Sequence, residues 1–287
     1  MVGEDPDRQT YALVGDAPLS ASLTNPYNGL PPLQPQDAVL EVRNLSCAYG
    51  NIAALHDIYC HFPEKQVTAI MGPSGCGKST LVKTLNRSLE LAPEGHLTAG
   101  SVLYRGNDIY DPRGDVMAIR RQIGIIHQRP VIFPLSIVEN VLFGAKFHQK
   151  IRGMSQTEYA ESYLEKVGLL DEIRDRLQDS AGKLSGGQQQ RLCLARTLAN
   201  QPDVILMDEP CSAIDPVSTQ RIEELIRELK RDYTIIIVTH NMNQAKRVSD
   251  LAVFMLGGRI VEAGETRRFF DQPQTELARS FISGVMG

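Results

Sequence analysis

The sequence predicts an α/β protein with a mainly parallel β-sheet flanked by helices. Short apolar runs at residues 67–71, 204–207 and 235–238 have the length and the apolar content of buried strands. The last two runs are separated by a helical pattern with apolar residues at core spacing across residues 222–229. Strands that alternate with helices in this way form parallel sheets joined by right-handed crossovers.

Length and composition exclude several classes of protein. A chain of 287 residues with 42% hydrophobic and 22% charged residues can bury a sizeable core, and it is neither disordered nor collagen-like. The formal net charge of −4 argues against broad electrostatic binding to nucleic acid or to anionic lipid. No apolar run approaches the roughly 20 residues that span a bilayer, so membrane association is expected to go through a protein partner.

The first residues and the cysteines predict the compartment. Residues 1–10 are acidic and polar, unlike a secretory signal, so we expect the protein to stay in the cytosol. The five cysteines are widely spaced without a C-x-x-C pair. This spacing favours reduced thiols, most of them in the core, over disulfides or a zinc site.

Residues 1–38 are predicted to form a flexible, proline-rich N-terminal tail. They contain six of the sixteen prolines and no sustained apolar period. A solvated extension is one interpretation, and a regulatory or docking segment is the other. The folded domain is expected to occupy residues 39–287.

The folded domain is predicted to begin with β-structure. An apolar run at residues 39–43 and an alternating pattern at residues 58–62 precede the strand at residues 67–71. A glycine-rich loop follows that strand directly. A helix comes next, and its apolar face contains Leu81, Val82, Leu85 and Leu89.

The middle of the chain is predicted to be helical. Ser155 and Glu158 fit a capping box at the start of a helix that ends at Gly168. The face of this helix that points to the core contains Tyr159, Tyr163, Leu164 and Val167. We therefore expect a helical subdomain inserted at roughly residues 129–194.

A complete phosphate-loop motif lies between the strand at residues 67–71 and the helix after it. G-x-x-x-x-G-K-S in this context predicts that backbone N–H groups and the helix N terminus bind phosphates. Lys78 is expected to reach the β- and γ-phosphates of ATP, and Ser79 to offer a hydroxyl to Mg²⁺. A purely structural glycine turn would not need Lys and Ser in succession. The predicted ATP-binding residues here are Gly72, Pro73, Ser74, Gly75, Cys76, Gly77, Lys78, Ser79 and Thr80.

Cys76 lies within this loop, close to the predicted helix N terminus. Such an environment can lower the pKa of a thiol. Phosphoryl transfer to water needs no covalent intermediate, however, so we expect Cys76 to be a packing residue and not a nucleophile.

Two carboxylates follow the apolar run at residues 204–207. Ligands bind beyond the carboxyl ends of parallel strands, so Asp208 and Glu209 should emerge beside the phosphate loop. Asp208 is predicted to hold Mg²⁺ through water, and Glu209 to orient and deprotonate the water that attacks the γ-phosphate. A strand that ends in Asp-Glu often simply runs into a solvated turn, but the phosphate loop favours the functional interpretation.

The segment Leu184-Ser185-Gly186-Gly187-Gln188 resembles the signature motif of the ATP-binding cassette (ABC) ATPases. It lies between the phosphate loop and the acidic strand, as in that family, and the resemblance covers essentially all of residues 39–287. The resemblance implies the P-loop NTPase ABC ATPase fold, with an N-terminal antiparallel β subdomain and a helical subdomain beside the mainly parallel sheet. It also implies a homodimer, in which two head-to-tail cassettes clamp two ATP molecules. The residues that would contact ATP at this interface are Ser185, Gly186, Gly187, Gln188 and Asp215.

Further residues match family positions by their order and spacing. The resemblance makes Tyr49 the aromatic residue that stacks on adenine, Gln128 the Q-loop glutamine that joins the Mg²⁺ shell, and His240 the histidine that senses the γ-phosphate. Tyr49, Gln128 and His240 each have a structural alternative: a core tyrosine, an inert surface glutamine and a satisfied histidine. Asp215 is also expected to cap a helix before Pro216, a role that coexists with its contact to ATP. The family order favours the functional interpretation. The expected catalytic residues are Glu209, His240 and Gln128, and the expected metal ligands are Ser79, Gln128 and Asp208.

Longer strings at residues 129–136, 184–196, 208–216 and 239–250 resemble the phosphate-importer ATPases within this family. His127 and the long tail depart from the usual pattern. The resemblance implies an importer subunit that couples ATP hydrolysis to uptake of inorganic phosphate. It implies ATP and Mg²⁺, two integral-membrane permease subunits and, indirectly, a substrate-binding protein outside the cell membrane. The expected location is peripheral, on the cytoplasmic face of the inner membrane, with no nucleic-acid partner.

Three alternatives stay open at this point. The cargo can be another small solute, such as an amino acid or an oxyanion, because this subunit need not touch it. A soluble ABC protein of translation or DNA repair is less favoured, because tandem cassettes and long coiled-coil insertions are absent from the sequence. A non-hydrolysing binding module would show no Mg²⁺-dependent ATP turnover.

Overall fold

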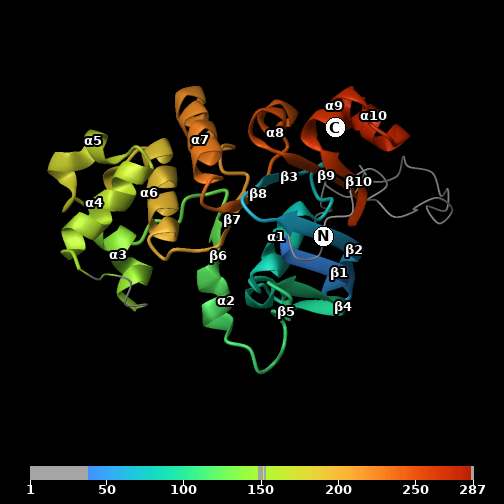
Figure 1. The fold of residues 1–287 in the computed structure, drawn as a ribbon, viewed down its shortest axis with the longest axis horizontal. Coiled ribbons are helices and arrows are strands. Elements are labelled where there is room, and N and C mark those ends of the chain that lie inside the picture. Colours follow the sequence, from blue (N-terminus) through green and yellow to red (C-terminus); the bar gives the residue numbers. More distant parts are fainter. Residues whose placement is uncertain (1–37, 148–150, 152, 286–287) are drawn as a thin grey trace, which may run out of the picture.

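The computed structural model describes residues 38–147, 151 and 153–285. The predicted tail, except for Ala38, lies outside the described residues. The described chain forms two β-sheets with helices around them (Figure 1).

A six-stranded sheet forms the centre of the molecule and confirms the predicted parallel sheet. Its strand order is β10-β9-β3-β8-β7-β6, and all neighbours are parallel except β9 and β10. The antiparallel edge strand β10 was not predicted. The strands are β3 (Val67–Met71), β6 (Ile123–Ile126), β7 (Val204–Asp208), β8 (Thr234–Val238), β9 (Leu251–Leu256) and β10 (Arg259–Glu265).

A separate four-stranded antiparallel sheet flanks the central sheet, as expected for the N-terminal subdomain. Its order is β2-β1-β4-β5. Gly50, at φ 56°, and Asn51 form the tight turn of the first hairpin, because Tyr49 pairs with Ile52. The strands are β1 (Ala38–Tyr49), β2 (Ile52–Pro63), β4 (Gly95–Tyr104) and β5 (Asn107–Asp108).

Alternation along the central strands divides the apolar interior into two cores. In β7, Ile205 and Met207 face a core shared with most of the helices, whereas Val204 and Leu206 face a core shared with the four-stranded sheet. Helix α1 (Lys78–Leu85) lies in this second core, between the two sheets. The phosphate-loop helix is therefore held by both sheets.

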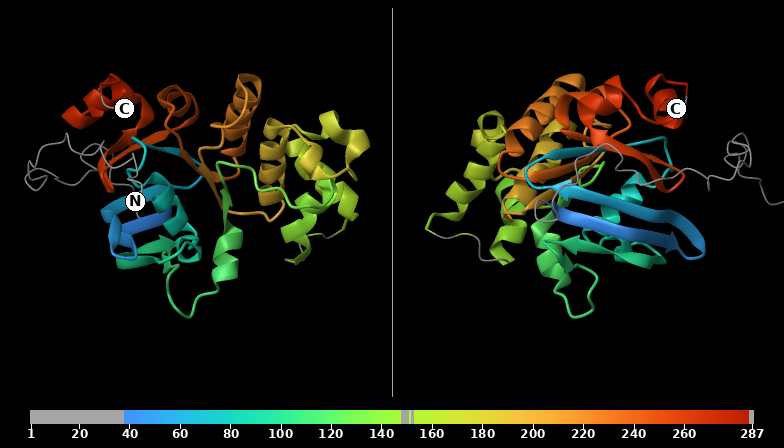
Figure 2. Two further views of the ribbon diagram at one scale, coloured as in Figure 1. Left: turned by 180° about the vertical axis from the view of Figure 1, so that it is seen from behind. Right: turned by 45° about the vertical axis from the view of Figure 1, so that its right-hand side comes forward.

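The helical part of the chain lies between β6 and β7 in sequence and at one end of the molecule in space (Figure 2). Ser155 and Glu158 make the predicted capping box at the start of α4. The last helix of this part continues beyond residue 194 and packs on β6, so it links the helical part to the central sheet. The helices are α3 (Ile137–Phe147), α4 (Gln156–Lys166), α5 (Leu170–Ile173) and α6 (Gly186–Leu198).

The remaining helices complete the layers around the central sheet. Helix α1 ends at Leu85, earlier than its apolar face suggests, and Leu89 lies in a short 3₁₀ helix, where it is still fully buried. None of the helices in the described part of the chain is long and apolar enough to span a bilayer. The other helices are α2 (Val116–Gln122), α7 (Pro216–Leu229), α8 (Met242–Val248), α9 (Thr266–Asp271) and α10 (Glu276–Ile282).

Candidate functional site: a phosphate loop and a cluster of polar strand ends

The predicted phosphate loop connects β3 to α1, and its glycines are required by the backbone. Gly72, Gly75 and Gly77 have φ values of 151°, 76° and 100°, in a region that side chains rarely adopt. A Cβ atom on Gly72 would lie 2.2 Å from the carbonyl oxygen of Met255. The chain can therefore curve closely at this loop, which leads into the N terminus of α1.

Lys78 is the first residue of α1 and is almost fully buried, with 6% of its surface exposed. Its Nζ atom donates hydrogen bonds to the carbonyl oxygens of Gly72 (2.8 Å) and Pro73 (2.9 Å). The ammonium group is thus held against the loop itself. A buried positive charge at a helix N terminus suits the binding of a polyanion such as a triphosphate.

Cys76 packs inside the loop, as expected, with 4% of its surface exposed. Burial raises the pKa of its thiol, and the nearby Lys78 only partly opposes this effect. The low thiol pKa that a helix N terminus can produce is therefore not realised, because desolvation dominates. This agrees with a packing role and not with a nucleophilic one.

Ser79 and Asp208 come together from α1 and β7. The Oγ atom of Ser79 donates a hydrogen bond of 2.9 Å to Oδ1 of Asp208. Burial raises the pKa of Asp208, and the Ser79 hydrogen bond acts in the opposite direction. Hydroxyl and carboxylate oxygens are ligands that suit Mg²⁺, which binds few protein groups and keeps phosphate and water oxygens for the rest. Within the described ranges, no cluster of three or more His, Cys, Asp or Glu side chains forms a metal cage.

Glu209, Gln128 and His240 meet beyond the ends of β7, β6 and β8. Oε2 of Glu209 accepts a hydrogen bond of 3.3 Å from Nε2 of Gln128 and lies 3.2 Å from Nδ1 of His240. The His240 side chain is 62% exposed, so this cluster opens to solvent. The structure therefore brings the three predicted catalytic side chains together at one edge of the sheet.

The backbone of Glu209 is strained. Its φ angle is 48°, in the left-handed region, and its N–H donates a hydrogen bond of 3.0 Å to the carbonyl oxygen of Val238. A non-glycine residue in this region needs support from its surroundings, and such strain collects at functional sites.

Tyr49 ends β1 beside the start of α1. Its hydroxyl lies 3.4 Å from Oγ1 of Thr80, and its ring is partly buried against the second core. The structure therefore places this tyrosine next to the phosphate loop, although the two are far apart in sequence.

The signature segment and Asp215 form a second group, at the N termini of α6 and α7. Ser185 caps α6 and makes a capping box with Gln188, and Asp215 caps α7 by accepting hydrogen bonds from the N–H groups of Val217 and Ser218. The predicted helix cap by Asp215 is thus confirmed, and it can coexist with the predicted contact of Asp215 to ATP, which stays a prediction. A Cβ on Gly187 would lie 2.1 Å from Oγ of Ser218, so only glycine allows the two helix ends to approach this closely.

This second group lies apart from the phosphate loop of the same chain. Helix α6 is on the far side of β6 and β7 from α1 (Figure 1). Among the described residues, no hydrogen bond or ion pair joins Ser185–Gln188 or Asp215 to the phosphate loop. A single chain therefore presents two separate candidate phosphate-binding elements.

Sequence reasoning missed the charged residues that support the signature segment. Glu172 accepts hydrogen bonds from Gln188, Arg191 and Arg221, which come from α6 and α7. The Ser185-x-x-Gln188 capping box was visible in the sequence. The convergence on Glu172 was not, because Glu172 and Arg221 are 49 positions apart.

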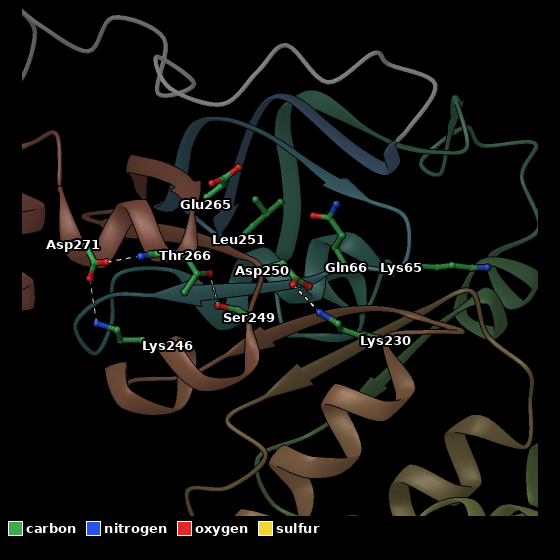
Figure 3. A pocket seen from close by; sticks show the side chains of 11 residues that line it. Lys65, Gln66, Lys230, Lys246, Ser249, Asp250, Leu251, Glu265, Thr266 and Asp271 are labelled. Carbon is green, nitrogen blue, oxygen red and sulfur yellow. Dashed lines mark hydrogen bonds and ion pairs between the residues drawn. The ribbon is translucent and has the colours of Figure 1, made fainter.

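A hollow of about 730 Å³ lies at the opposite edge of the central sheet, where β3 and β9 begin (Figure 3). It contains none of the predicted site residues. Two pairs of its charged side chains form salt bridges: Lys230 with Asp250 at 2.7 Å, and Lys246 with Asp271 at 3.4 Å. The candidate site is therefore the edge that carries the phosphate loop.

A phosphate loop, a cluster of polar side chains at strand ends and a second group at two helix N termini are features of the class of ABC ATPases. The model of the family described as ABC transporter matches residues 55–212, and the chain belongs to that family. It is 47% identical over 264 residues to the phosphate import ATP-binding protein PstB of Prochlorococcus marinus, an alignment that covers 88% of this chain and 97% of the relative. It is 50% identical over 256 residues to the protein of the same name from Oceanobacillus iheyensis, covering 89% and 92%.

Solved structures show the same fold. The chain matches cbiO1 of Clostridium perfringens, described as part of the ABC transporter complex cbiONQ, with a TM-score of 0.72 and 28% identity, over 87% of this chain and 100% of that one. It also matches a bacterial Atm1-family ABC exporter with ATP bound, with a TM-score of 0.71 and 25% identity, over 86% of this chain and 42% of the exporter.

Proposed function

We propose that this chain is the ATP-hydrolysing subunit of an ABC importer that takes up inorganic phosphate. The observation that carries the ATPase part is the meeting of Gln128, Glu209 and His240 beside the Ser79–Asp208 pair. The names of the relatives support phosphate as the cargo. The exporter of the same fold with ATP bound supports ATP as the nucleotide.

In the proposed reaction, the phosphate loop binds the triphosphate. Backbone N–H groups of the Gly72–Ser79 segment face the phosphates, and Lys78 turns from the loop carbonyls to the β- and γ-phosphates. Tyr49 stacks on the adenine, since its ring adjoins Thr80.

Ser79, Asp208 and Gln128 would hold Mg²⁺, with Asp208 acting through water. The metal ion supplies positive charge that neutralises the phosphate oxygens. The buried position of Asp208 disfavours its charged form when it is alone, so a cation beside it offsets the cost of desolvation.

Glu209 acts on the attacking water. Its carboxylate orients the water and accepts its proton as the water oxygen bonds to the γ-phosphorus and the bond to the β-phosphate oxygen breaks. Gln128 and His240 both contact Oε2 of this carboxylate. His240 also donates a hydrogen bond to the γ-phosphate, so the loss of that group releases the histidine.

A homodimer completes the site. Because Ser185–Gln188 lies apart from the phosphate loop of its own chain, we infer that it acts on ATP held by a second copy in a head-to-tail arrangement. The N terminus of α6 then faces the γ-phosphate. Binding of two ATP molecules closes the dimer, and hydrolysis opens it again.

The helical part passes this motion to the permeases. In the proposed domain division, residues 39–287 form one ABC ATPase domain, residues 1–38 a tail, and roughly residues 129–194 the helical insertion. An aromatic patch on the insertion is made of Phe133, Phe143 and Phe147. The Phe143 ring contacts both of the other rings, and Phe147 is 75% exposed. Such a patch suits the docking of two integral-membrane permease subunits on the cytoplasmic face of the inner membrane, with a substrate-binding protein on the other side.

Uptake of labelled phosphate tests the cargo. A strain without this chain should lose high-affinity uptake, and the wild-type gene should restore it, whereas a gene carrying Glu209→Gln should not. Unchanged uptake in the deletion strain, with no duplicate cassette present, contradicts phosphate as the cargo and favours another small solute.

Glu209→Gln tests the chemistry. Loss of the base should lower ATP turnover by about a hundredfold or more, while ATP binding remains and the closed dimer accumulates. Phosphate release and size-exclusion chromatography with ATP and Mg²⁺ measure these effects. Turnover close to that of the wild type would remove Glu209 from the base role.

A further inference from the structure

Glu172 joins the signature helix to the helix that follows it. The residue lies on α5, and both of its carboxylate oxygens are used: Oε1 accepts from Nη1 of Arg191 (3.0 Å), and Oε2 accepts from Nη2 of Arg191 (2.9 Å). Arg191 is only 3% exposed. A buried guanidinium needs such a two-pronged partner, so the position of α6 depends on Glu172.

The same carboxylate reaches the signature motif itself. Oε2 of Glu172 accepts a hydrogen bond of 3.0 Å from Nε2 of Gln188. This contact orients the Gln188 amide so that its Oε1 atom accepts from the backbone N–H of Ser185 at 3.1 Å. Glu172 is therefore connected to Ser185, at the tip of α6, through the side chain of Gln188.

A third contact crosses to the central part of the molecule. Oε1 of Glu172 also accepts a hydrogen bond from Nη1 of Arg221, on α7. Asp215 caps this helix, and its first turn packs against Gly187. One carboxylate thus links the two helices whose N termini carry Ser185 and Asp215.

The charges at this junction are strongly coupled. Burial alone would raise the pKa of Glu172, but hydrogen bonds from Arg191 and Gln188 and the charges of Arg191 and Arg221 lower it to about 2. The carboxylate therefore stays ionised throughout the physiological range, and the junction behaves as a fixed link rather than a pH switch.

We propose that Glu172 is a positioning residue for the signature motif: it fixes Gln188 and Arg191 against Arg221, so that the Ser185 tip meets ATP on a second copy of the chain. The proposal rests on the proposed function, because the tip acts only in the ATP-bound dimer. It predicts a defect in dimer closure and in kcat, with no defect in the binding of ATP to the phosphate loop of the same chain.

Glu172→Gln tests this in two backgrounds. With Glu209→Gln, the added substitution should raise the dissociation constant of the ATP-dependent dimer by about tenfold, the size expected for loss of hydrogen bonds to a charged group. In the otherwise wild-type chain, kcat should fall by a similar factor. The affinity of the monomer for a fluorescent ATP analogue should not change.

Asp171→Asn is the matched control. Asp171 is the neighbour of Glu172 on α5, its side chain is 96% exposed, and it pairs with Arg174 on the same surface. This substitution removes one negative charge from the same helix and should leave turnover, dimerisation and ATP affinity as in the wild type. An equal loss in both variants would show a general effect of charge and overturn the proposal.

Arg221→Gln removes only the link to α7 and keeps the protein testable if Glu172→Gln disturbs folding. The Arg221 side chain is 49% exposed, so its loss should spare the fold. It should weaken the dimer in the Glu209→Gln background, and Glu172→Gln added to it should cause less than the sum of the two single effects. Unchanged dimerisation in Arg221→Gln, or additive effects, overturn the proposal.

The proposed function and this inference fail in different ways. If the Glu209→Gln chain itself forms no ATP-dependent dimer, the proposed composite site is wrong and the role of Glu172 falls with it. If that chain dimerises and the Glu172→Gln chain dimerises equally well, only the positioning role is wrong.

Discussion

At the residue scale, the site combines a strained backbone with a carboxylate whose burial is costly. Glu209 holds a left-handed φ of 48°, and its neighbour Asp208 has a pKa raised by burial. Both features work against stability, and neither improves the packing of the core. They accompany two carboxylates that lie side by side at the edge of the sheet, where the proposed catalysis needs them. In this proposal, the site gives up stability for its chemistry.

Asp208→Asn should therefore make the protein more stable and inactive. Because burial raises the pKa of Asp208 in the folded state, the unfolded chain releases this proton at a lower pH than the folded chain. The resulting loss of folding stability is absent below the ordinary Asp pKa of about 3.9 and complete above the folded pKa. The gain from Asn should be largest at neutral pH and vanish in acid. Urea unfolding at several pH values measures it. Turnover should fall by about a hundredfold, because the carboxylate proposed to hold Mg²⁺ through water is lost.

A gain in stability that persists below the ordinary Asp pKa would contradict this account of Asp208. The Ser79 hydroxyl can still donate to the amide oxygen of Asn, so the substitution changes the charge more than the hydrogen bonding.

Single residues were predicted from sequence where a motif fixes their spacing. The phosphate loop and the strand-end carboxylates are local patterns, so the sequence predicts both their identity and their edge of the sheet. Glu172 has no such pattern, because its partners come from two other helices. The burial that keeps the pKa of the Cys76 thiol high comes from the folded core and could not be seen in the sequence.

At the scale of elements, helices α4 and α6 both begin with a capping box. Ser155 caps α4 and Ser185 caps α6, each in a complete capping box. The capping chemistry is alike, but only α6 carries the signature motif. The pair therefore separates the contribution of a cap to stability from its contribution to function.

Ser155→Ala and Ser185→Ala should each lower the free energy of unfolding by about 1 kcal/mol. Only Ser185→Ala should lower ATP turnover and weaken the ATP-dependent dimer, because its hydroxyl also serves the second nucleotide. Chemical unfolding and phosphate release measure the two effects. Equal turnover in the two variants would contradict the role of the α6 tip.

The aromatic patch on the insertion leads to a prediction about assembly. Phe147→Ser should leave the unfolding free energy of the isolated chain within about 0.5 kcal/mol and its ATPase activity unchanged. It should reduce co-purification with the permeases, because an apolar contact is lost. Met117→Ser on α2, where Met117 is 62% exposed, is the control and should have no effect on co-purification.

Element boundaries were the weaker part of the sequence prediction. The apolar face that runs through Leu89 suggests a longer α1, but the chain leaves the α-helix after Leu85 and still buries Leu89 through a short 3₁₀ turn. Strand β10 pairs antiparallel at the edge, and no periodicity distinguishes it from a parallel strand. Apolar patterns report burial, and direction is set by partners distant in sequence.

At the scale of the whole molecule, two sheets share the core around α1. Leu81, Val82 and Leu85 of this helix pack between the central sheet and the antiparallel sheet that carries Tyr49. The phosphate loop and Tyr49, the proposed adenine contact, thereby adjoin the same core. Nucleotide binding should consequently stabilise the whole fold and not only a loop.

Thermal unfolding with and without Mg·ATP tests this linkage. ATP at about a hundredfold above its dissociation constant should add at least about 2.7 kcal/mol to the stability of the Glu209→Gln chain, because formation of the closed dimer adds to the effect of binding. Lys78→Ala added to this chain should abolish most of the shift, because the buried ammonium is lost. Lys146→Ala, at an exposed position on α3, should retain it. A full shift in the Lys78 variant would contradict the proposed binding mode.

The distance between the phosphate loop and the α6 tip has a genetic consequence. In the proposed dimer, one gene that carries both a loop mutation and a tip mutation inactivates both pockets. When the two mutations lie on separate genes that are expressed together, a dimer of the two different chains keeps one intact pocket. Alleles that are null alone should therefore complement when they are expressed together, provided that each lies at a different end of the chain. Two alleles from the same end should not.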